Sequence, residues 1–164
     1  MRFKNREAAG KKLAERLKSY AKEDAVVYAL PRGGVILGFE IAQALSLPLD
    51  IIIIRKIGRP SNEEYAMGAV GEDDLMILNE SAFAPADELW LKREIEKQKK
   101  EVLRRDMLYR EDREPADVAG KTAIIVDDGI ATGFTVKLAV KAIKNKHPGK
   151  IIVAVPVAPS ESIH

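Results

Sequence analysis

The stretch that most clearly determines the fold is Ala123-Ile124-Ile125-Val126-Asp127-Asp128-Gly129-Ile130-Ala131-Thr132-Gly133-Phe134-Thr135. Four apolar residues lead into two carboxylates, and a loop of small residues with two hydroxyls follows before an expected helix. The N-terminus of a helix offers unpaired N–H groups and a positive dipole end, so it suits a phosphate group. Because a bare carboxylate repels phosphate, we expect Asp127 and Asp128 to bind sugar hydroxyls or a magnesium ion.

The sequence on both sides of this stretch alternates between strand and helix patterns. Buried strands are expected in four apolar runs that lack polar alternation: 25–30, 49–57, 121–126 and 151–157. Amphipathic or apolar helices are expected at 5–20, 35–45 and 134–143. Alternating strands and helices predict an α/β fold with a mostly parallel central sheet flanked by helices. Ligands bind such sheets beyond the carboxyl ends of the strands.

The middle of the chain predicts a loop, two short strands and a long helix. Residues 58–65 have loop composition, and short strands at 66–70 and 75–78 enclose a turn-rich stretch. Pro85 in a first helical turn opens a helix that extends to about Arg113.

A narrow apolar stripe follows one side of this long helix, formed by Leu91, Ile95, Val102 and Tyr109. Gln98 and Arg105 interrupt the stripe. The interruption favours a solvated face with i,i+4 charge pairs over a coiled-coil partner helix.

Composition excludes several classes of protein. The 164 residues include no cysteine, which excludes a disulfide scaffold, a thiol nucleophile and a Cys-ligated metal site. Two histidines, His147 and His164, are too few for a multi-histidine metal centre. Twenty-seven basic and 25 acidic residues leave a net charge of +2, which is too balanced to indicate a nucleic-acid partner.

No segment predicts targeting to a membrane. The charged first seven residues lack the apolar core of a signal peptide, and the longest apolar runs, 51–54 and 151–155, are too short to cross a bilayer. The length fits one hydrophobic core. We therefore expect a single cytoplasmic domain over residues 1–164.

The stretch 123–135 resembles the phosphoribosyl pyrophosphate (PRPP) motif of the type I phosphoribosyltransferases: an apolar run, two acids, two residues, then a small residue and Thr-Gly-x-Thr. The resemblance implies a Rossmann-like core and Mg²⁺ as cofactor. Asp127 and Asp128 would hold the 2′- and 3′-hydroxyls of ribose, and they are candidate ligands of a Mg²⁺ bound mainly through PRPP. The 5′-phosphate would be cradled by Ala131, Thr132, Gly133, Phe134 and Thr135.

Two further stretches agree with this resemblance. Pro31-Arg32-Gly33-Gly34 is similar to the family's pyrophosphate loop, in which Arg32 would face the pyrophosphate while Gly33 and Gly34 bring N–H groups close to it. The family often has a non-proline cis peptide in this loop, here between Pro31 and Arg32. Arg55 and Lys56, at the end of the expected second strand, would add two cations at the same edge.

Purely structural interpretations of these residues remain open. Gly33-Gly34 taken alone is equally a tight strand-to-helix turn, and Arg55-Lys56 an ordinary solvated strand end. A dinucleotide-binding turn is disfavoured because Val35 occupies the place of the second glycine. A nucleotide-hydrolase site is disfavoured because the sequence has no Gly-x-x-x-x-Gly-Lys-Ser/Thr loop.

The whole chain, including 55–60 and 66–70, looks most like the "predicted" branch of these transferases, which has no firmly assigned acceptor.

The sequence departs from the family in two places. Hypoxanthine/guanine enzymes carry an acid, their candidate base catalyst, where this chain has Ala131, so no catalytic residue is assigned; adenine enzymes also have alanine there. Relatives continue past the strand equivalent to 151–157 into a hood over the acceptor, whereas seven residues follow here, so we expect an incomplete hood.

The resemblance implies a phosphoribosyltransferase of nucleotide metabolism. It would transfer phosphoribose from PRPP to an unidentified nitrogen base and release pyrophosphate. The alternative is a non-catalytic sensor that binds PRPP or a nucleotide and reports it to a partner. A homodimer is left open as the assembly.

Overall fold

The computed structural model describes residues 3–59, 62–79, 88–111 and 113–159. Its internal contacts divide the chain into two compact units. The first unit comprises Met1–Ile52, Pro115–Ala131 and Ile143–His164, and the second comprises Ile53–Glu114 and Thr132–Ala142. In the part of the chain described, no helix is both long enough and apolar enough to cross a membrane.

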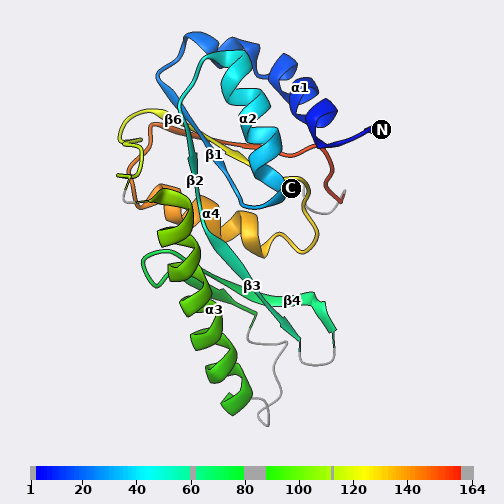
Figure 1. Ribbon diagram of the computed structural model, residues 1–164, viewed down its shortest axis with the longest axis vertical. Helices are drawn as coiled ribbons and strands as arrows, with labels where there is room; N and C mark the ends of the chain where they lie inside the picture. The colour runs from blue at the N-terminus through cyan, green and yellow to red at the C-terminus, as the bar shows by residue number, and fades with distance from the viewer. Residues whose placement is uncertain (1–2, 60–61, 80–87, 112, 160–164) are drawn as a thin grey trace. The chain divides into compact units, whose positions relative to one another are not determined.

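A four-stranded parallel sheet forms the centre of the first unit (Figure 1). The strand order is β2-β1-β6-β7, and each neighbouring pair is parallel. The central strands β1 and β6 are buried along their whole length, whereas the edge strands are partly exposed. This sheet confirms the predicted α/β fold. The strands are β1 (Ala25–Ala29), β2 (Leu49–Ile51), β6 (Thr122–Val126) and β7 (Lys150–Ala154).

Two helices, α1 (Arg6–Arg16) and α2 (Gly33–Leu45), pack against each other, and α2 packs against this sheet (Figure 1). The side chain of Asn5 caps α1 by accepting a hydrogen bond from the N–H of Ala8 at 2.9 Å. A short 3-10 helix, η1 (Lys18–Lys22), follows α1. The shared core combines alternate residues of the central strands with the inner faces of both helices: Ala9, Ala14, Val27, Leu37, Ile41, Ile124 and Val126.

The expected strand at 49–57 is wrong, because the chain changes sheets within it. β2 ends at Ile51, and β3 (Ile54–Arg59) begins the sheet of the second unit. The N–H of Ile52 still bonds to the carbonyl of Ala29 at 3.0 Å, whereas the N–H of Ile53 donates to Glu72 Oε1 at 2.8 Å. A carboxylate therefore replaces the strand partner at the bend, and an uninterrupted apolar run contains no residue that marks such a bend.

The sheet of the second unit is antiparallel, in the order β3-β4-β5. β4 covers Asn62–Gly71 and β5 covers Met76–Leu78, which confirms strands at the two expected places, 66–70 and 75–78. β4 is longer than expected, because it begins four residues earlier. The loop expected at 58–65 is wrong, since both of its ends belong to the β3–β4 hairpin. The polar composition of this stretch reflects an irregular hairpin whose register shifts around Gly58.

The long helix α3 (Glu88–Arg110) lies alongside β3 and β4 (Figure 1), and Pro85 lies outside the described residues. Charge pairs such as Lys92–Glu88 and Arg104–Glu101 confirm the predicted solvated face. Gln98 is 8% exposed and the Arg105 side chain 14%, so both belong to the buried side of the helix rather than interrupting it. α4 covers Phe134–Lys144, close to its expected range.

Candidate functional site

The loop after β1 lies against the carboxyl end of β6. The N–H of Leu30 donates to the carbonyl of Val126 at 2.9 Å. A β-carbon at Gly34 would lie 2.6 Å from that same carbonyl oxygen, so only glycine fits there. The peptide between Pro31 and Arg32 is cis, as the sequence resemblance implies.

Helix α2 begins at Gly33, two residues before its expected start. Gly33 and Gly34 therefore form the first helical turn and not a loop, although glycine is a poor helix former. The reason is steric, because a side chain at either position would collide with the end of β6 or the residues after it. In this first turn the N–H of Gly34 donates to the carbonyl of Leu30 at 3.0 Å, and the N–H of Val35 donates to the carbonyl of Arg32 at 3.3 Å.

Asp127 and Asp128 follow β6 directly, as the sequence predicts. Asp127 Oδ1 accepts a hydrogen bond from the N–H of Asp128 at 2.8 Å. A β-carbon at Gly33 would overlap with the Asp128 carboxylate. The structure thus brings the predicted ribose acids next to the predicted pyrophosphate loop, at one end of the sheet.

The two aspartates differ in their electrostatic environment. Burial, with a smaller contribution from the neighbouring charge of Asp128, raises the pKa of Asp127 to about 6. The carboxylate of Asp128 is instead paired with a guanidinium, that of Arg6. Asp127 consequently lacks a compensating cation among the described residues. A hydroxyl donor or a divalent cation would therefore stabilise the ionised form of Asp127 more than that of Asp128.

Arg6 was not singled out from the sequence. Its Nε and Nη2 atoms donate to Asp128 Oδ2 at 2.9 and 2.6 Å. A β-carbon at Gly10 would lie 3.0 Å from Leu37 Cα, so this glycine lets α1 approach α2 closely. One sequence signal points to Arg6: with Asn5 as the cap, it is a cation in the first turn of a helix, where the dipole disfavours positive charge.

The loop that follows Asp128 leads into α4 as predicted. Ala131 and Thr132 are exposed, whereas Gly133, Phe134 and Thr135 are partly buried. Gly133 has φ +80°, a left-handed conformation that favours glycine. α4 begins at Phe134, so the expected phosphate cradle lies at a helix N-terminus in the structure.

Arg55 and Lys56 are not at the end of a parallel strand. Both lie in β3 of the second unit, opposite Val70 and Ala69 in the antiparallel sheet. Their expected placement was wrong because the isoleucine run before them divides between two sheets. Their contact with pyrophosphate stays a prediction.

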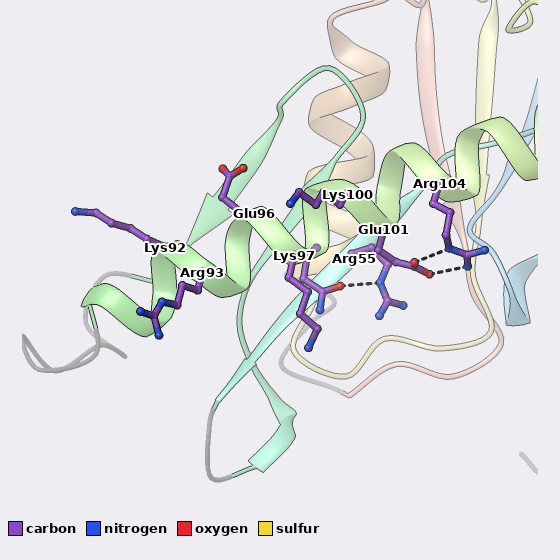
Figure 2. A pocket seen from close by; sticks show the side chains of 9 residues that line it. Arg55, Lys92, Arg93, Glu96, Lys97, Lys100, Glu101 and Arg104 are labelled. Atoms are coloured by element: carbon purple, nitrogen blue, oxygen red, sulfur yellow. Dashed lines mark hydrogen bonds and ion pairs between the residues drawn. The ribbon is translucent and has the colours of Figure 1, made fainter.

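Arg55 lines an open groove of about 780 Å³ along α3 (Figure 2). Its Nε donates to Gln98 Oε1 at 2.9 Å, and Gln98 in turn donates to Glu94 at 2.7 Å. Hydrogen bonds from Arg104 and Arg105 lower the pKa of the groove's Glu101 to about 2. The remaining charged residues that line the groove are Lys92, Arg93, Glu96, Lys97, Lys100 and Arg104.

The carboxylates of Asp127 and Asp128 are suitable ligands for magnesium. Within the described residues, no group of three His, Asp or Glu side chains is assembled for a metal. Asp127 and Asp128 are consecutive in the chain, and Oδ1 of Asp128 lies outside the two hydrogen bonds that this carboxylate accepts from Arg6. Mg²⁺ commonly binds one or two carboxylates together with substrate phosphates, and these two side chains match that mode.

The fold and this site define an α/β domain with a carboxylate pair and a glycine-dependent loop at the carboxyl ends of its parallel strands. Residues 2–163 match the family model described as phosphoribosyl transferase domain. The chain belongs to this family.

Relatives support the assignment. A protein of Mycobacterium tuberculosis (strain H37Rv) named "Putative phosphoribosyl transferase Rv0571c" is 39% identical over 163 residues, which are 98% of this chain and 37% of the relative. The chain thus spans little more than a third of the length of the curated relatives it matches.

Solved structures agree in fold. The crystal structure of TT1426 from Thermus thermophilus is 40% identical with a TM-score of 0.77, and the match covers 99% of this chain and 78% of that one. The purine phosphoribosyltransferase from Pyrococcus horikoshii is 18% identical with a TM-score of 0.54, over 94% of this chain and 73% of that one. The second likeness concerns the fold alone.

Proposed function

We propose that the chain is a magnesium-dependent phosphoribosyltransferase domain that binds PRPP and transfers phosphoribose to a nitrogen base. The observation that carries this proposal is the contact between two motifs far apart in sequence. The glycine turn at Gly33 is packed so closely on Asp128 that a methyl group has no room between them. A ligand with both a sugar and a pyrophosphate group would engage both motifs.

Asp127 and Asp128 would accept hydrogen bonds from the 2′- and 3′-hydroxyls of ribose. A hydroxyl donor stabilises the ionised carboxylate, so ligand binding would lower the raised pKa of Asp127. The loop of residues 131–135 follows directly in the chain, and its N–H groups and the Thr132 and Thr135 hydroxyls would bind the 5′-phosphate.

The pyrophosphate would be bound by Arg32 and by the N–H group of Gly33, with Arg55 and Lys56 as further cations. The N–H of Gly34 donates to the Leu30 carbonyl at 3.0 Å, so Gly34 would contribute through the close backbone packing that holds the loop against β6. These groups would neutralise the negative charge that develops on the leaving group. Mg²⁺, when bound, would supply additional neutralisation of the pyrophosphate oxygens. Asp127 and Asp128 are the residues that would hold it.

In the proposed reaction, the acceptor nitrogen forms a bond to C1′ of the ribose while the C1′–O bond to pyrophosphate breaks. The electron pair of that bond leaves with pyrophosphate, and the acceptor nitrogen loses its proton. The task of the protein is to position both reactants, since correct orientation alone contributes a large part of such rate enhancements.

One observation favours a second candidate. Ala131 stands where hypoxanthine/guanine enzymes have an acid, so residues 129–135 include no carboxylate to take the acceptor's proton. A non-catalytic sensor of PRPP or of nucleotides would need the ribose and phosphate contacts but no such base.

Pyrophosphate release tests the proposal. The chain is incubated with PRPP, Mg²⁺ and each base of a panel, and released pyrophosphate is measured alongside PRPP binding by calorimetry. Release that depends on one base supports the transferase. Binding without release supports the sensor, and the absence of PRPP binding contradicts both.

A further inference from the structure

A cavity of about 580 Å³ opens beside Asp128 in the first unit. Its walls come from four segments: the start of α1 with the residues before it, the start of α2, Asp128 after β6 and the segment after β7. Most of the wall is apolar, contributed by Phe3, Ala9, Ile36, Leu37, Pro156 and Val157.

Two of these apolar side chains are exposed to solvent. Ile36 is 43% exposed and Val157 is 56% exposed. A ring bound in this cavity would remove apolar surface of the wall from water, and burial of such surface is favourable by about 25 cal/mol per Å². The volume of the cavity and its mostly apolar wall therefore suit the ring of a base.

Among the described residues that line this cavity, Arg6 is the one cation. Its guanidinium has five N–H donors, and the two bonds to Asp128 leave three of them without a partner in the described part of the chain. Both bonds go to Oδ2, so Oδ1 of Asp128 can accept a ribose hydroxyl while Arg6 stays in place. Asp128 thus orients Arg6 at the border between a ribose site and the cavity.

We propose that this cavity binds the acceptor ring and that Arg6 selects rings whose edge carries a carbonyl or carboxylate oxygen. The inference rests on the proposed phosphoribosyl transfer. A guanidinium only donates hydrogen bonds, so it pairs with an oxygen acceptor and opposes an amino group at the same place. Among the bases, those with an oxo group are favoured over their amino counterparts.

Matched nucleoside 5′-monophosphates differ only in the base, so they isolate the contribution of the ring to the binding affinity. Calorimetry compares inosine with adenosine monophosphate and uridine with cytidine monophosphate, with ribose 5-phosphate as the part common to all. We expect the oxo member of at least one pair to bind about tenfold more tightly, as for one hydrogen bond to a charged donor. Equal affinities within both pairs would overturn the role of Arg6.

Arg6→Gln tests the residue itself, and Arg16→Gln is its control on the same helix, away from the cavity. The preference for the oxo ring is expected to disappear in Arg6→Gln and to persist in Arg16→Gln. A preference that survives in Arg6→Gln would contradict the inference. Ribose 5-phosphate that fails to bind the wild-type chain would instead overturn the proposed function together with it.

Val157→Trp tests the location of the ring without touching Arg6. Because Val157 lies on the wall of the cavity, a larger side chain there changes the affinity of every monophosphate whose ring enters it. Ribose 5-phosphate has no ring, and its affinity is expected to stay the same. Monophosphate affinities that remain unchanged would place the base elsewhere.

Discussion

The guanidinium of Arg110 and the carboxylate of Glu72 form an ion pair between the end of α3 and the residue after β4, with Nη2 and Oε1 3.2 Å apart. Only 9% of the Arg110 side chain and 17% of the Glu72 side chain are exposed. Glu72 Oε1 also accepts the N–H of Ile53, where the chain enters β3. One carboxylate therefore joins three segments of the second unit.

Glu72→Ala is expected to destabilise the protein by about 2–4 kcal/mol. The change removes a carboxylate partner from a buried guanidinium and leaves the N–H of Ile53 without its acceptor. Urea denaturation followed by circular dichroism measures the free energy of unfolding. Lys92→Ala, which removes the exposed pair with Glu88, is the control and should cost less than about 1 kcal/mol. Equal losses in the two variants would show that Glu72 does not join these segments.

The free energy of unfolding is expected to fall as the pH rises from about 4 to about 6 through Asp127. The folded-state pKa of this carboxyl is about 6 and its ordinary value 3.8, so the folded chain binds more protons than the unfolded chain in this window. The stabilising contribution is complete below the ordinary value and is lost above the folded value. At pH 7 the wild type carries a buried negative charge at this position, and Asp127→Asn removes that charge. The variant should therefore be more stable than the wild type at pH 7 by on the order of 1–3 kcal/mol.

Denaturation of both proteins at pH 4 and pH 7, without Mg²⁺, checks this prediction. Asp24→Asn removes one exposed negative charge and serves as the control for net charge. A stability difference between wild type and Asp127→Asn that is the same at both pH values would contradict the assignment. The same variant should bind ribose 5-phosphate less tightly, because it loses a charged acceptor.

Gly34→Ala is expected to destabilise the chain by at least about 1 kcal/mol, despite the better helix propensity of alanine. The new methyl group would lie 2.6 Å from the Val126 carbonyl oxygen, which is backbone and cannot turn away. Gly129→Ala is the matched control, since its methyl group would meet only the Val157 carbonyl oxygen at 3.6 Å. Its stability should stay within about 0.5 kcal/mol of the wild type. Equal melting temperatures for the two variants would refute the close packing at Gly34.

Gly133→Ala should weaken the binding of ribose 5-phosphate, whereas Gly120→Ala should not. Both glycines have left-handed backbones, with φ +80° and +71°, so each substitution costs about 1–2 kcal/mol of conformational energy. Only Gly133 precedes α4 in the expected phosphate cradle. Calorimetric titration of each variant gives the affinity. A similar affinity in both would show that the cradle does not bind the phosphate.

Much of the fold could be predicted because its signals are local. The stretch from Thr122 to Thr135 contains a complete apolar strand, two acids and a helix start within a few residues, and the structure confirms each element. The antiparallel strands at 66–70 and 75–78 were equally readable, since a polar turn separates two short apolar runs. Local periodicity is sufficient wherever an element ends at a recognisable breaker.

The misplaced elements depend on contacts that local sequence does not encode. Ile51 to Ile54 form one apolar run in the sequence. In the structure the N–H of Ile53 donates to the Glu72 carboxylate, and the strand ends at this point. Arg6 and Asp128 are 122 positions apart, and no periodicity joins them. The prediction that Gln98 interrupts the apolar side of α3 is wrong for a related reason. Its amide is buried because its oxygen accepts a hydrogen bond from Arg55, a contact that exists only in the folded chain.

The strand order of the first unit has a consequence for the nascent chain. β1 gains β2 on one side soon after synthesis, but its other neighbour, β6, emerges only after the whole of Ile53–Glu114 has been made. Until then the hydrogen-bonding groups along that side of β1 are open to strands of other molecules. Late, long-range pairing of this kind slows folding and exposes intermediates to aggregation. Recovery of the protein from denaturant should therefore fall as its concentration rises.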